Sequence, residues 1–393
     1  MHHLLMTSVA HKYEPAQLLE SSCLLFDLLR SPSEYERWFE RFSSGTIFRL
    51  GFGKRIMTGR EELLRRIFDV NKNVERVASP GAYLADTFPL LMSLPSVISP
   101  FRRELQGLHA KELALFRELR DDVRTEMAQG TAPDCWEKTF LSQREQYDLT
   151  DDEGAYAVGI LFEAGSGTTA AAMMSFVLAM VLHPEWMTKM QREIDSMVGS
   201  SRLPIFEDMR NLPTVRAVIK EVMRWRPVTA GGLPHQLTKD DVYNGVFLPA
   251  GTNVHPNQWA IHREPELYPD PETFNPARWL EPGYPTYREP LTLYPNLQNY
   301  SCFGFGRRIC PGQNIAERSL NILVARIAWA CDISKARDAD GVEIEVPEYD
   351  YCAGFNAQPN HFSFDLKARS PERAAIVEHE MNEQMKNDPL AGR

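Results

Sequence analysis

The chain has 393 residues, of which 43% are hydrophobic and 24% are charged, as in an ordinary globular protein with a large core. Its formal charge of -10 argues against nucleic acid as a partner, because phosphate binding needs clustered Lys and Arg. Its cysteines form no C-x-x-C pair, which argues against a disulfide framework and a zinc ribbon and favours an intracellular protein. They are Cys23, Cys135, Cys302, Cys310, Cys331 and Cys352.

The first part of the chain is predicted to be helical. The first 30 residues contain neither a signal peptide nor a run of about 20 apolar residues, so no membrane anchor is expected there. Pro184 suits the first position of a helix, and Gly199 suits the stop after its last turn. The spacing of apolar residues predicts helices over 14–29, 103–127, 149–182 and 185–197.

The third of these helices is apolar enough between residues 155 and 182 to raise the alternative of an integral membrane protein. It is interrupted by Glu163 and by the sequence A-G-S-G-T-T at residues 164–169, which would be costly facing lipid. We therefore expect the central helix of a large globular core. By themselves, the small residues indicate close helix packing.

A helix near residue 220 carries a charged pair. Glu221 and Arg224 are spaced i, i+3, so their side chains can meet, and Pro227 ends the helix. Such a pair is most often a solvated surface pair that contributes little to stability. The apolar face of this helix consists of Val215, Val218, Val222 and Trp225.

Regular structure is predicted to be sparser after residue 240. Residues 242–247 read V-Y-N-G-V-F, which predicts a hairpin with a type I′ turn at Asn-Gly. Alternating apolar residues predict half-buried strands near 342–346 and 362–366. The proline-rich stretch 264–297 is expected to have no regular structure, and the charged tail 371–393 is expected to fray.

Residues 303–312 read F-G-F-G-R-R-I-C-P-G and precede a helical pattern. Cys310 is therefore expected at a helix N-terminus, where free N–H groups and the helix dipole stabilise a metal-binding thiolate. Gly304, Gly306 and Gly312 leave room for a flat macrocycle, and Arg308 offers a fork suited to a carboxylate. Taken alone, a free cysteine is more often a small buried hydrophobe.

Four motifs in this order resemble the cytochrome P-450 family of haem-thiolate monooxygenases: A-G-x-x-T-T, E-x-x-R, F-x-P-x-R at residues 274–278, and F-x-x-G-x-R-x-C-x-G. The R-R-x-C-P-G form is most similar to that of microsomal members, and among them to that of fungal members. The resemblance implies a mainly α fold with a small β region, formed by one domain over residues 1–370. The family's N-terminal anchor, first sheet and early helices have no counterpart in this chain, and residues 371–393 form a charged tail.

The resemblance also implies site residues. Cys310 would ligate the iron of haem b, Arg308 would bind a haem propionate, and Thr168 would assist oxygen activation. Gly167 stands where the family has an acid, and Glu163 would replace that acid through water. Glu221, Arg224 and Arg278 would form a buried triad behind the haem. Further haem contacts would be Phe303, Gly306 and Gly312, and substrate contacts would be Phe162, Val228, Leu233 and Phe355.

The implied reaction inserts one atom of O2 into a small lipophilic molecule, such as a specialised metabolite, and reduces the other atom to water. No G-x-G-x-x-G opens a βαβ unit, so the chain is not expected to hold its own nicotinamide or flavin. The resemblance implies that electrons come from an NADPH-dependent flavoprotein reductase. Arg307 and Arg318 are candidate docking charges, and family members reside at the endoplasmic reticulum membrane. The second alternative is a truncated haem-binding protein without turnover.

Overall fold

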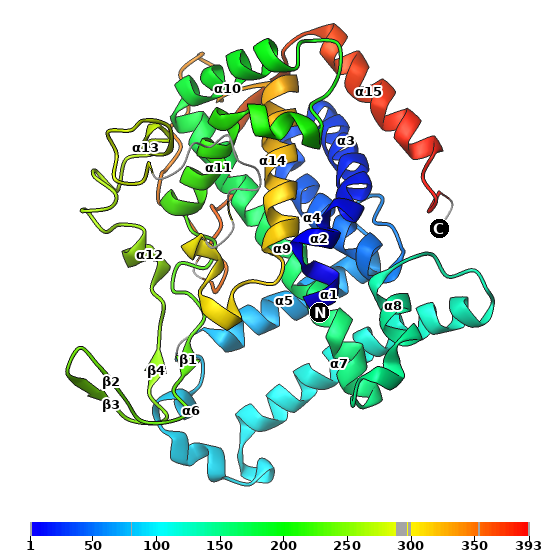
Figure 1. The fold of residues 1–393 in the computed structure, drawn as a ribbon, viewed down its shortest axis with the longest axis vertical. Coiled ribbons are helices and arrows are strands. Elements are labelled where there is room, and N and C mark those ends of the chain that lie inside the picture. The colour runs from blue at the N-terminus through cyan, green and yellow to red at the C-terminus, as the bar shows by residue number, and fades with distance from the viewer. Residues whose placement is uncertain (1, 80, 288–296, 298–299, 353, 392–393) are drawn as a thin grey trace.

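The computed structural model describes residues 2–79, 81–287, 297, 300–352 and 354–391. These residues form a mainly helical body with short strands beside it (Figure 1). The helices are α1 (His2–Leu5), α2 (Thr7–Ala10), α3 (Glu14–Arg30), α4 (Tyr35–Phe52), α5 (Glu62–Ala78), α6 (Leu84–Thr87), α7 (Pro100–Ala128), α8 (Trp136–Ser142), α9 (Asp151–Leu182), α10 (Pro184–Met197), α11 (Pro213–Trp225), α12 (Gln258–Ile261), α13 (Ala277–Leu280), α14 (Gln313–Ala330) and α15 (Pro371–Lys386). The predicted mainly α fold class and the four long helices are confirmed.

The strands of the described residues pair into three two-stranded antiparallel sheets. The predicted hairpin is confirmed, because Asn244 and Gly245 take the positive φ angles, 47° and 80°, that its turn requires. The strands are β1 (His235–Gln236) with β4 (Asn253–Val254), β2 (Asp241–Tyr243) with β3 (Val246–Leu248), and β5 (Cys331–Lys335) with β6 (Phe364–Ala368).

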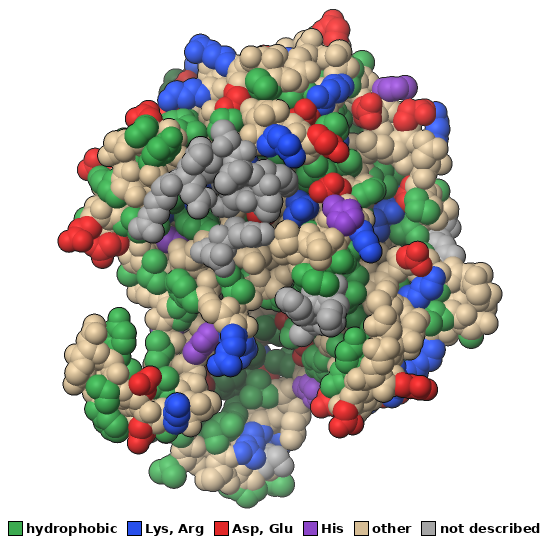
Figure 2. Space-filling model, in the orientation of Figure 1, with side chains coloured by type: hydrophobic (Ala, Val, Ile, Leu, Met, Phe, Trp, Pro, Cys, Tyr) green, Lys and Arg blue, Asp and Glu red, His purple; other side chains and the backbone are tan. Residues whose placement is uncertain are grey.

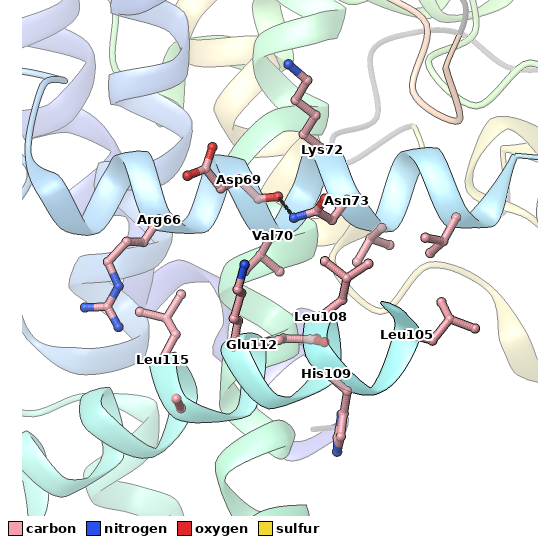
Figure 3. Close-up of a pocket in the computed structure, with 14 residues that line it drawn as sticks. Arg66, Asp69, Val70, Lys72, Asn73, Leu105, Leu108, His109, Glu112 and Leu115 are labelled. Carbon is pink, nitrogen blue, oxygen red and sulfur yellow. Dashed lines mark hydrogen bonds between the residues drawn. The ribbon is translucent and has the colours of Figure 1, made fainter. Parts of the chain in front are cut away.

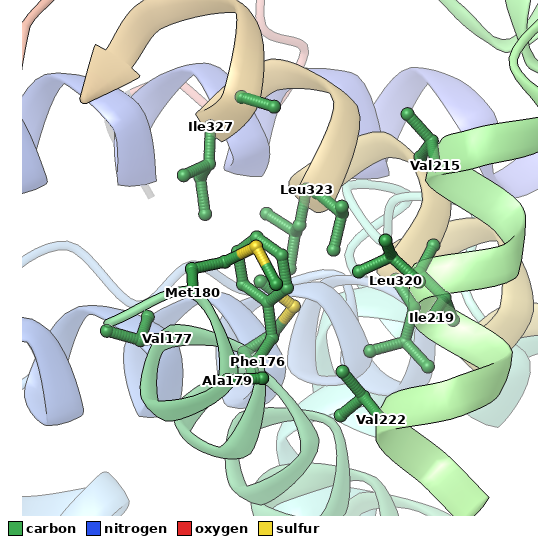
Figure 4. Packing of buried hydrophobic residues seen from close by; sticks show 14 of the residues in the cluster. Phe176, Val177, Ala179, Met180, Val215, Ile219, Val222, Leu320, Leu323 and Ile327 are labelled. Carbon is green, nitrogen blue, oxygen red and sulfur yellow. The ribbon is translucent and has the colours of Figure 1, made fainter. Parts of the chain in front are cut away.

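Helix α9 is the centre of the protein. A capping box formed by Thr150 and Glu153 starts it, and every residue from 170 to 181 is buried. Its second half packs against α11 and α14 through interlocking aliphatic and aromatic side chains (Figure 4). Its first half packs against α4, α5 and α7 in a second cluster. The second half of the helix is apolar on all sides because all of its sides are covered.

The membrane-spanning alternative for residues 155–182 is tested by this packing. Within the described residues, α9 is the one helix long and apolar enough to cross a bilayer, but 72% of its most apolar window is buried inside the protein. Its apolar surface is satisfied by neighbouring helices instead of lipid. The structure therefore favours the expectation of a central core helix.

Two expectations about the C-terminal part are wrong. Residues 342–346 form no strand beyond one isolated bridge, because Val342 and Ile344 are exposed and, of the three alternating apolar residues, Val346 alone reaches the core. The tail does not fray but forms α15, which packs on α3. Asp388, just after α15, is buried and bound by Arg49 of α4, at 2.6 and 2.8 Å. Residues 264–287 contain one short helix, α13, and residues 288–296 lie outside the described part.

Candidate functional site

The cysteine loop, residues 301–312, is shaped by two 3₁₀ turns and ends at α14. The amide of Cys310 donates to the carbonyl of Phe303 at 2.7 Å, which closes the loop, and Gly312 is the N-cap of α14. The backbone N–H groups of Gly312 and Gln313 lower the pKa of the half-buried Cys310 thiol, but burial is the larger effect and raises it overall. The predicted helix N-terminus is present, but its donors alone do not ionise the sulfur. A metal ion would have to displace the thiol proton.

Glycine gives this loop an open face. Gly304 and Gly306 have φ of 85° and 59°, and a Cβ added to either would meet no atom within 4 Å. A Cβ added to Gly312 would lie 3.8 Å from the Cys310 sulfur. The loop therefore presents a sulfur and bare backbone without side chains above them, which is the surface that a flat macrocycle can approach. Phe303 is half-buried and packs against the core cluster.

The two arginines of the loop are exposed. Arg307 and Arg308 make no hydrogen bond or ion pair with the described residues, so both guanidinium groups remain available to a ligand or partner. The docking expectation for Arg318 is wrong, because this side chain is buried and bound to Glu14 at 3.1 Å. It fastens α14 to α3 instead of facing a partner.

The predicted charged triad is present and buried. Arg224 donates to both oxygens of Glu221 at 2.8 and 2.9 Å, and Arg278 donates to Oε1 at 3.0 Å. Sequence reasoning missed two further donors to the same carboxylate, the amide of Asn275 and Nε1 of Trp279. Both lie near Arg278 in the F-N-P-A-R-W segment, so their closeness to Arg278 in the sequence could have indicated these contacts. Because every partner is satisfied, the network joins α11 to α13 rigidly.

One face of α9 is left open in the middle of this buried helix. Ile160 and Ala164 are exposed, Thr168 is half-buried, and a Cβ at Gly167 would meet nothing within 4 Å. The hydroxyl of Thr168 donates to the carbonyl of Ala164 at 3.2 Å, which leaves its oxygen free to accept. The face thus combines an apolar surface with one hydroxyl.

Gly165 does not interrupt α9. The helix is continuous there, and a Cβ at Gly165 would lie 2.5 Å from Ile47 of α4. Ser43 of α4 donates to the Gly165 carbonyl at 2.7 Å. Gly165 therefore allows α4 and α9 to pack closely, as the small residues of this segment indicate by themselves.

Glu163 and Phe162 lie away from Thr168. Phe162 is fully buried and stacks on Phe48 with ring centroids 5.1 Å apart, and its assignment to the substrate pocket stays a prediction. Glu163 faces Glu112 of α7, and burial followed by this neighbouring carboxyl raises its pKa to about 7. The structure does not bring Glu163 and the Thr168 hydroxyl together. At about 100° per residue the two positions point about 140° apart.

The remaining pocket residues come partly together. The amide of Ala357 donates to the carbonyl of Val228 at 2.6 Å, so the segment that contains Phe355 lies beside Val228. Phe355 and Val228 are half-buried, whereas Leu233 is largely exposed. These positions can line a shared surface.

Another hollow of the molecule lies apart from this arrangement. The face shown in Figure 2 is hollowed below its centre, with hydrophobic side chains in view. A cavity of about 550 Å³ lies between α5 and α7 (Figure 3), and its lining comes only from those two helices. It includes no residue of the cysteine loop or of the open face of α9. It is therefore separate from the candidate site.

The residues present fit a haem group. A single cysteine sulfur lies at an uncovered glycine backbone, and a free guanidinium at Arg308 is suited to a carboxylate. No group of three or more His, Cys, Asp or Glu side chains that could hold a metal by themselves occurs in the described residues. A metal at Cys310 would therefore need most of its ligands from a bound cofactor, as haem iron has.

Comparison with known proteins gives one consistent result. The family model "Cytochrome P450" matches residues 3–345. A cytochrome P450 monooxygenase of Armillaria gallica is 36% identical over 96% of this chain and 74% of its own length. The monooxygenases psoD of Aspergillus fumigatus and verL of Clonostachys rogersoniana are 34% and 36% identical over 95% and 98% of this chain, and 72% and 71% of their own lengths.

A solved structure of a zebra fish cytochrome P450, with abiraterone, shares the fold. Its TM-score is 0.70 and its identity 23%, over 94% of this chain and 80% of that one. The family match over most of the chain, together with the cysteine loop and the buried triad, shows that this chain belongs to the cytochrome P450 family of monooxygenases.

Proposed function

We propose that this chain oxidises a small lipophilic molecule, with Cys310 as the axial ligand of haem b. The observation that carries the proposal is the Cys310 sulfur at the N-terminus of α14, beside the N–H groups of Gly312 and Gln313. Bound through a thiolate, haem supplies an electron-rich iron that favours O–O cleavage. The chain itself holds the sulfur, binds the cofactor's carboxylates and orients the substrate.

Each polar residue of the site has one task in this proposal. Arg308 binds a propionate, because its guanidinium is exposed and otherwise without a partner in the described residues. The Thr168 hydroxyl would accept a hydrogen bond on the open face of α9, because its own proton is donated to the Ala164 carbonyl. We assign this task to Thr168 and not to Glu163, whose carboxyl faces α7. Ile160 and Ala164 give the substrate an apolar surface.

The decisive experiment is the reduced carbon-monoxide spectrum of the haem-loaded protein. Thiolate ligation gives a red-shifted band, which Cys310→Ala must lose. Cys302→Ala is the matched control, because Cys302 lies in the same loop but is not assigned as a ligand. A band retained in Cys310→Ala, or absent from the wild type, would refute the ligand assignment.

The finer parts of the proposal concern the substrate and the electron donor. The curated relatives come from fungi, which supports a specialised metabolite as substrate. An NADPH-dependent flavoprotein reductase would dock near the free, exposed Arg307. Arg307→Glu should then slow reduction by the reductase and weaken the dependence of that rate on salt, while reduction by dithionite stays unchanged. If the reduction rates of the wild type and of Arg307→Glu depend on salt alike, docking does not use Arg307.

Turnover separates this proposal from a haem-binding protein without activity. Thr168→Ala should lower product formed per NADPH consumed and raise peroxide release, and Thr168→Ser should restore the ratio because it keeps the hydroxyl. A wild type that binds haem, accepts electrons and releases only peroxide with every lipophilic compound tried would favour the inactive alternative.

We also propose that the protein works at a membrane surface, as members of its family do. The segment between α5 and α7 exposes six apolar side chains, each at least half accessible: Leu84, Phe88, Leu90, Met92, Val97 and Ile98. Such a patch is large for a surface facing only water. Leu90→Ser with Val97→Ser should reduce flotation with phosphatidylcholine vesicles, whereas Val342→Ser, at another exposed site, should not. Equal flotation of all variants would refute this role.

A further inference from the structure

Ser301, at the start of the cysteine loop, is held from two directions by α12 and the residue after it. Its side-chain oxygen lies 2.7 Å from Nε2 of His262, and its carbonyl accepts from Nε2 of Gln258 at 2.8 Å. Two positions later, the Phe303 carbonyl receives the amide of Cys310 at 2.7 Å. The position of Ser301 therefore bears directly on the hydrogen bond that closes the loop around the proposed iron ligand.

His262 is fully buried, and its ring lies flat on Tyr300, with centroids 5.4 Å apart and an interplanar angle of 12°. Burial, followed by the charge of Arg224, lowers the pKa of His262 to about 3, so the ring is neutral. Its Nδ1 has no hydrogen-bond partner among the described residues. A buried ring with one unsatisfied nitrogen gains little net stability from its single hydrogen bond. The hydrogen bond of His262 is therefore better explained by the position it gives to Ser301 than by a gain in stability.

The other end of His262 belongs to the charged triad. Its backbone carbonyl accepts from Nη1 of Arg224 at 3.0 Å, and Arg224 is bound to both oxygens of Glu221. One residue thus touches the buried triad through its backbone and the cysteine loop through its side chain. Ser301 is the loop residue that the His262 side chain contacts.

We propose that His262 and Ser301 are positioning residues that transmit the rigidity of the Glu221 triad to the cysteine loop and so keep Cys310 in the geometry for iron ligation. The inference rests on the proposed ligand role of Cys310. Neither residue touches the reacting atoms. Their contribution is to limit how far the loop opens, since a ligand held loosely is exchanged or protonated more easily.

Three variants of the full haem-loaded chain test the inference. His262→Phe keeps the stacked ring and removes both nitrogens, His262→Gln keeps a nitrogen at about the same reach, and Ser301→Ala removes only the hydroxyl. Thr214→Val is the matched control, because it removes a 2.7 Å hydroxyl contact to Glu193 far along the chain from the loop. Ser301→Ala is the mildest change and guards against a folding defect in the histidine variants.

The first measurement is hydrogen exchange of the Cys310 amide, and the second is the share of haem that shows the red-shifted carbon-monoxide band. His262→Phe and Ser301→Ala should each speed the exchange about 5- to 10-fold and lower the share with the band. His262→Gln should recover most of both, and Thr214→Val should change neither. The double variant His262→Phe with Ser301→Ala should be no worse than either single variant.

Exchange at the wild-type rate in His262→Phe and Ser301→Ala would overturn the inference, as would effects that multiply in the double variant. Equal effects in Thr214→Val would show general loosening and would also overturn it. Failure of the ligand assignment is distinguishable, since the wild type would then lack the band while the exchange rates still reported on the loop.

Discussion

Replacing Glu221 by Gln should destabilise the protein by about 3–5 kcal/mol, because it strands two buried arginines. Glu221 has no exposed surface and accepts five hydrogen bonds, three of them from Arg224 and Arg278. Gln removes the charge and turns an amide N–H toward groups that are themselves donors. The arginines keep only backbone carbonyls as partners, such as those of Pro271 and Pro269. The loss is a large part of the roughly 5–15 kcal/mol that keeps a typical domain folded.

Urea unfolding of the full chain measures this loss. With a slope near 3 kcal/mol/M, the midpoint should fall by about 1–1.7 M. Glu62→Gln is the matched control, because Glu62 pairs with Arg65 at the same i, i+3 spacing but on the exposed surface, where an ion pair contributes little to stability. Trp279→Phe, which removes one neutral donor to Glu221, should fall between the two. Indistinguishable midpoints for Glu221→Gln and Glu62→Gln would refute the reasoning from buried charge.

Three further predictions follow from packing and burial. Gly165→Ala should cost about 1–3 kcal/mol because its methyl group meets Ile47, whereas Gly167→Ala should be neutral or stabilise by up to about 1 kcal/mol; thermal unfolding compares them. Burial raises the pKa of Glu137 to about 8 from an ordinary 4.5, and its carboxylate has no hydrogen-bond partner in the described chain. The contribution of the protonated Glu137 side chain to stability is full below about pH 4.5 and is lost as the pH rises through about 8. Glu137→Gln should therefore flatten the decline of the unfolding free energy with pH, by about 1–3 kcal/mol over that window, as measured by urea titration. Asp388→Asn should cost about 3 kcal/mol and make α15 sensitive to limited proteolysis, because it strands the arginines that bind Asp388; unchanged cleavage would contradict this anchoring.

Local patterns predicted the features whose causes are local. The long helices, the Asn244-Gly245 turn and the helix after Cys310 depend on spacing and backbone chemistry within a few residues. The triad was predictable only through the motif order, because Glu221 and Arg278 are far apart in the chain. Asp388 pairs with Arg49 across 339 residues, and no sequence pattern near either residue predicts that pair. The tail therefore looked like a solvated charged segment.

Helix geometry alone bears on the predicted substrate contact of Phe162. Phe162 and Thr168 are six positions apart, which turns their side chains about 120° away from each other on a helix with about 3.6 residues per turn. That angle already disfavours a contact of both residues with one ligand. By contrast, the alternation at 342–346, of which Val346 alone is buried, could not be separated from a strand by sequence, because the pattern does not show which of its residues a core covers.

The two glycines of the A-G-S-G-T-T segment explain how α9 can be both packed and open. Gly165 is required on the α4 side, where Ile47 leaves no room for a methyl group. Gly167 faces the other way and has free space around it, so packing does not require glycine there. A carboxylate at residue 167 would fit without steric conflict, and its absence is therefore a difference in chemistry and not a consequence of the fold. We therefore expect proton delivery in the proposed reaction to use the Thr168 hydroxyl and water, since Glu163 is turned toward α7.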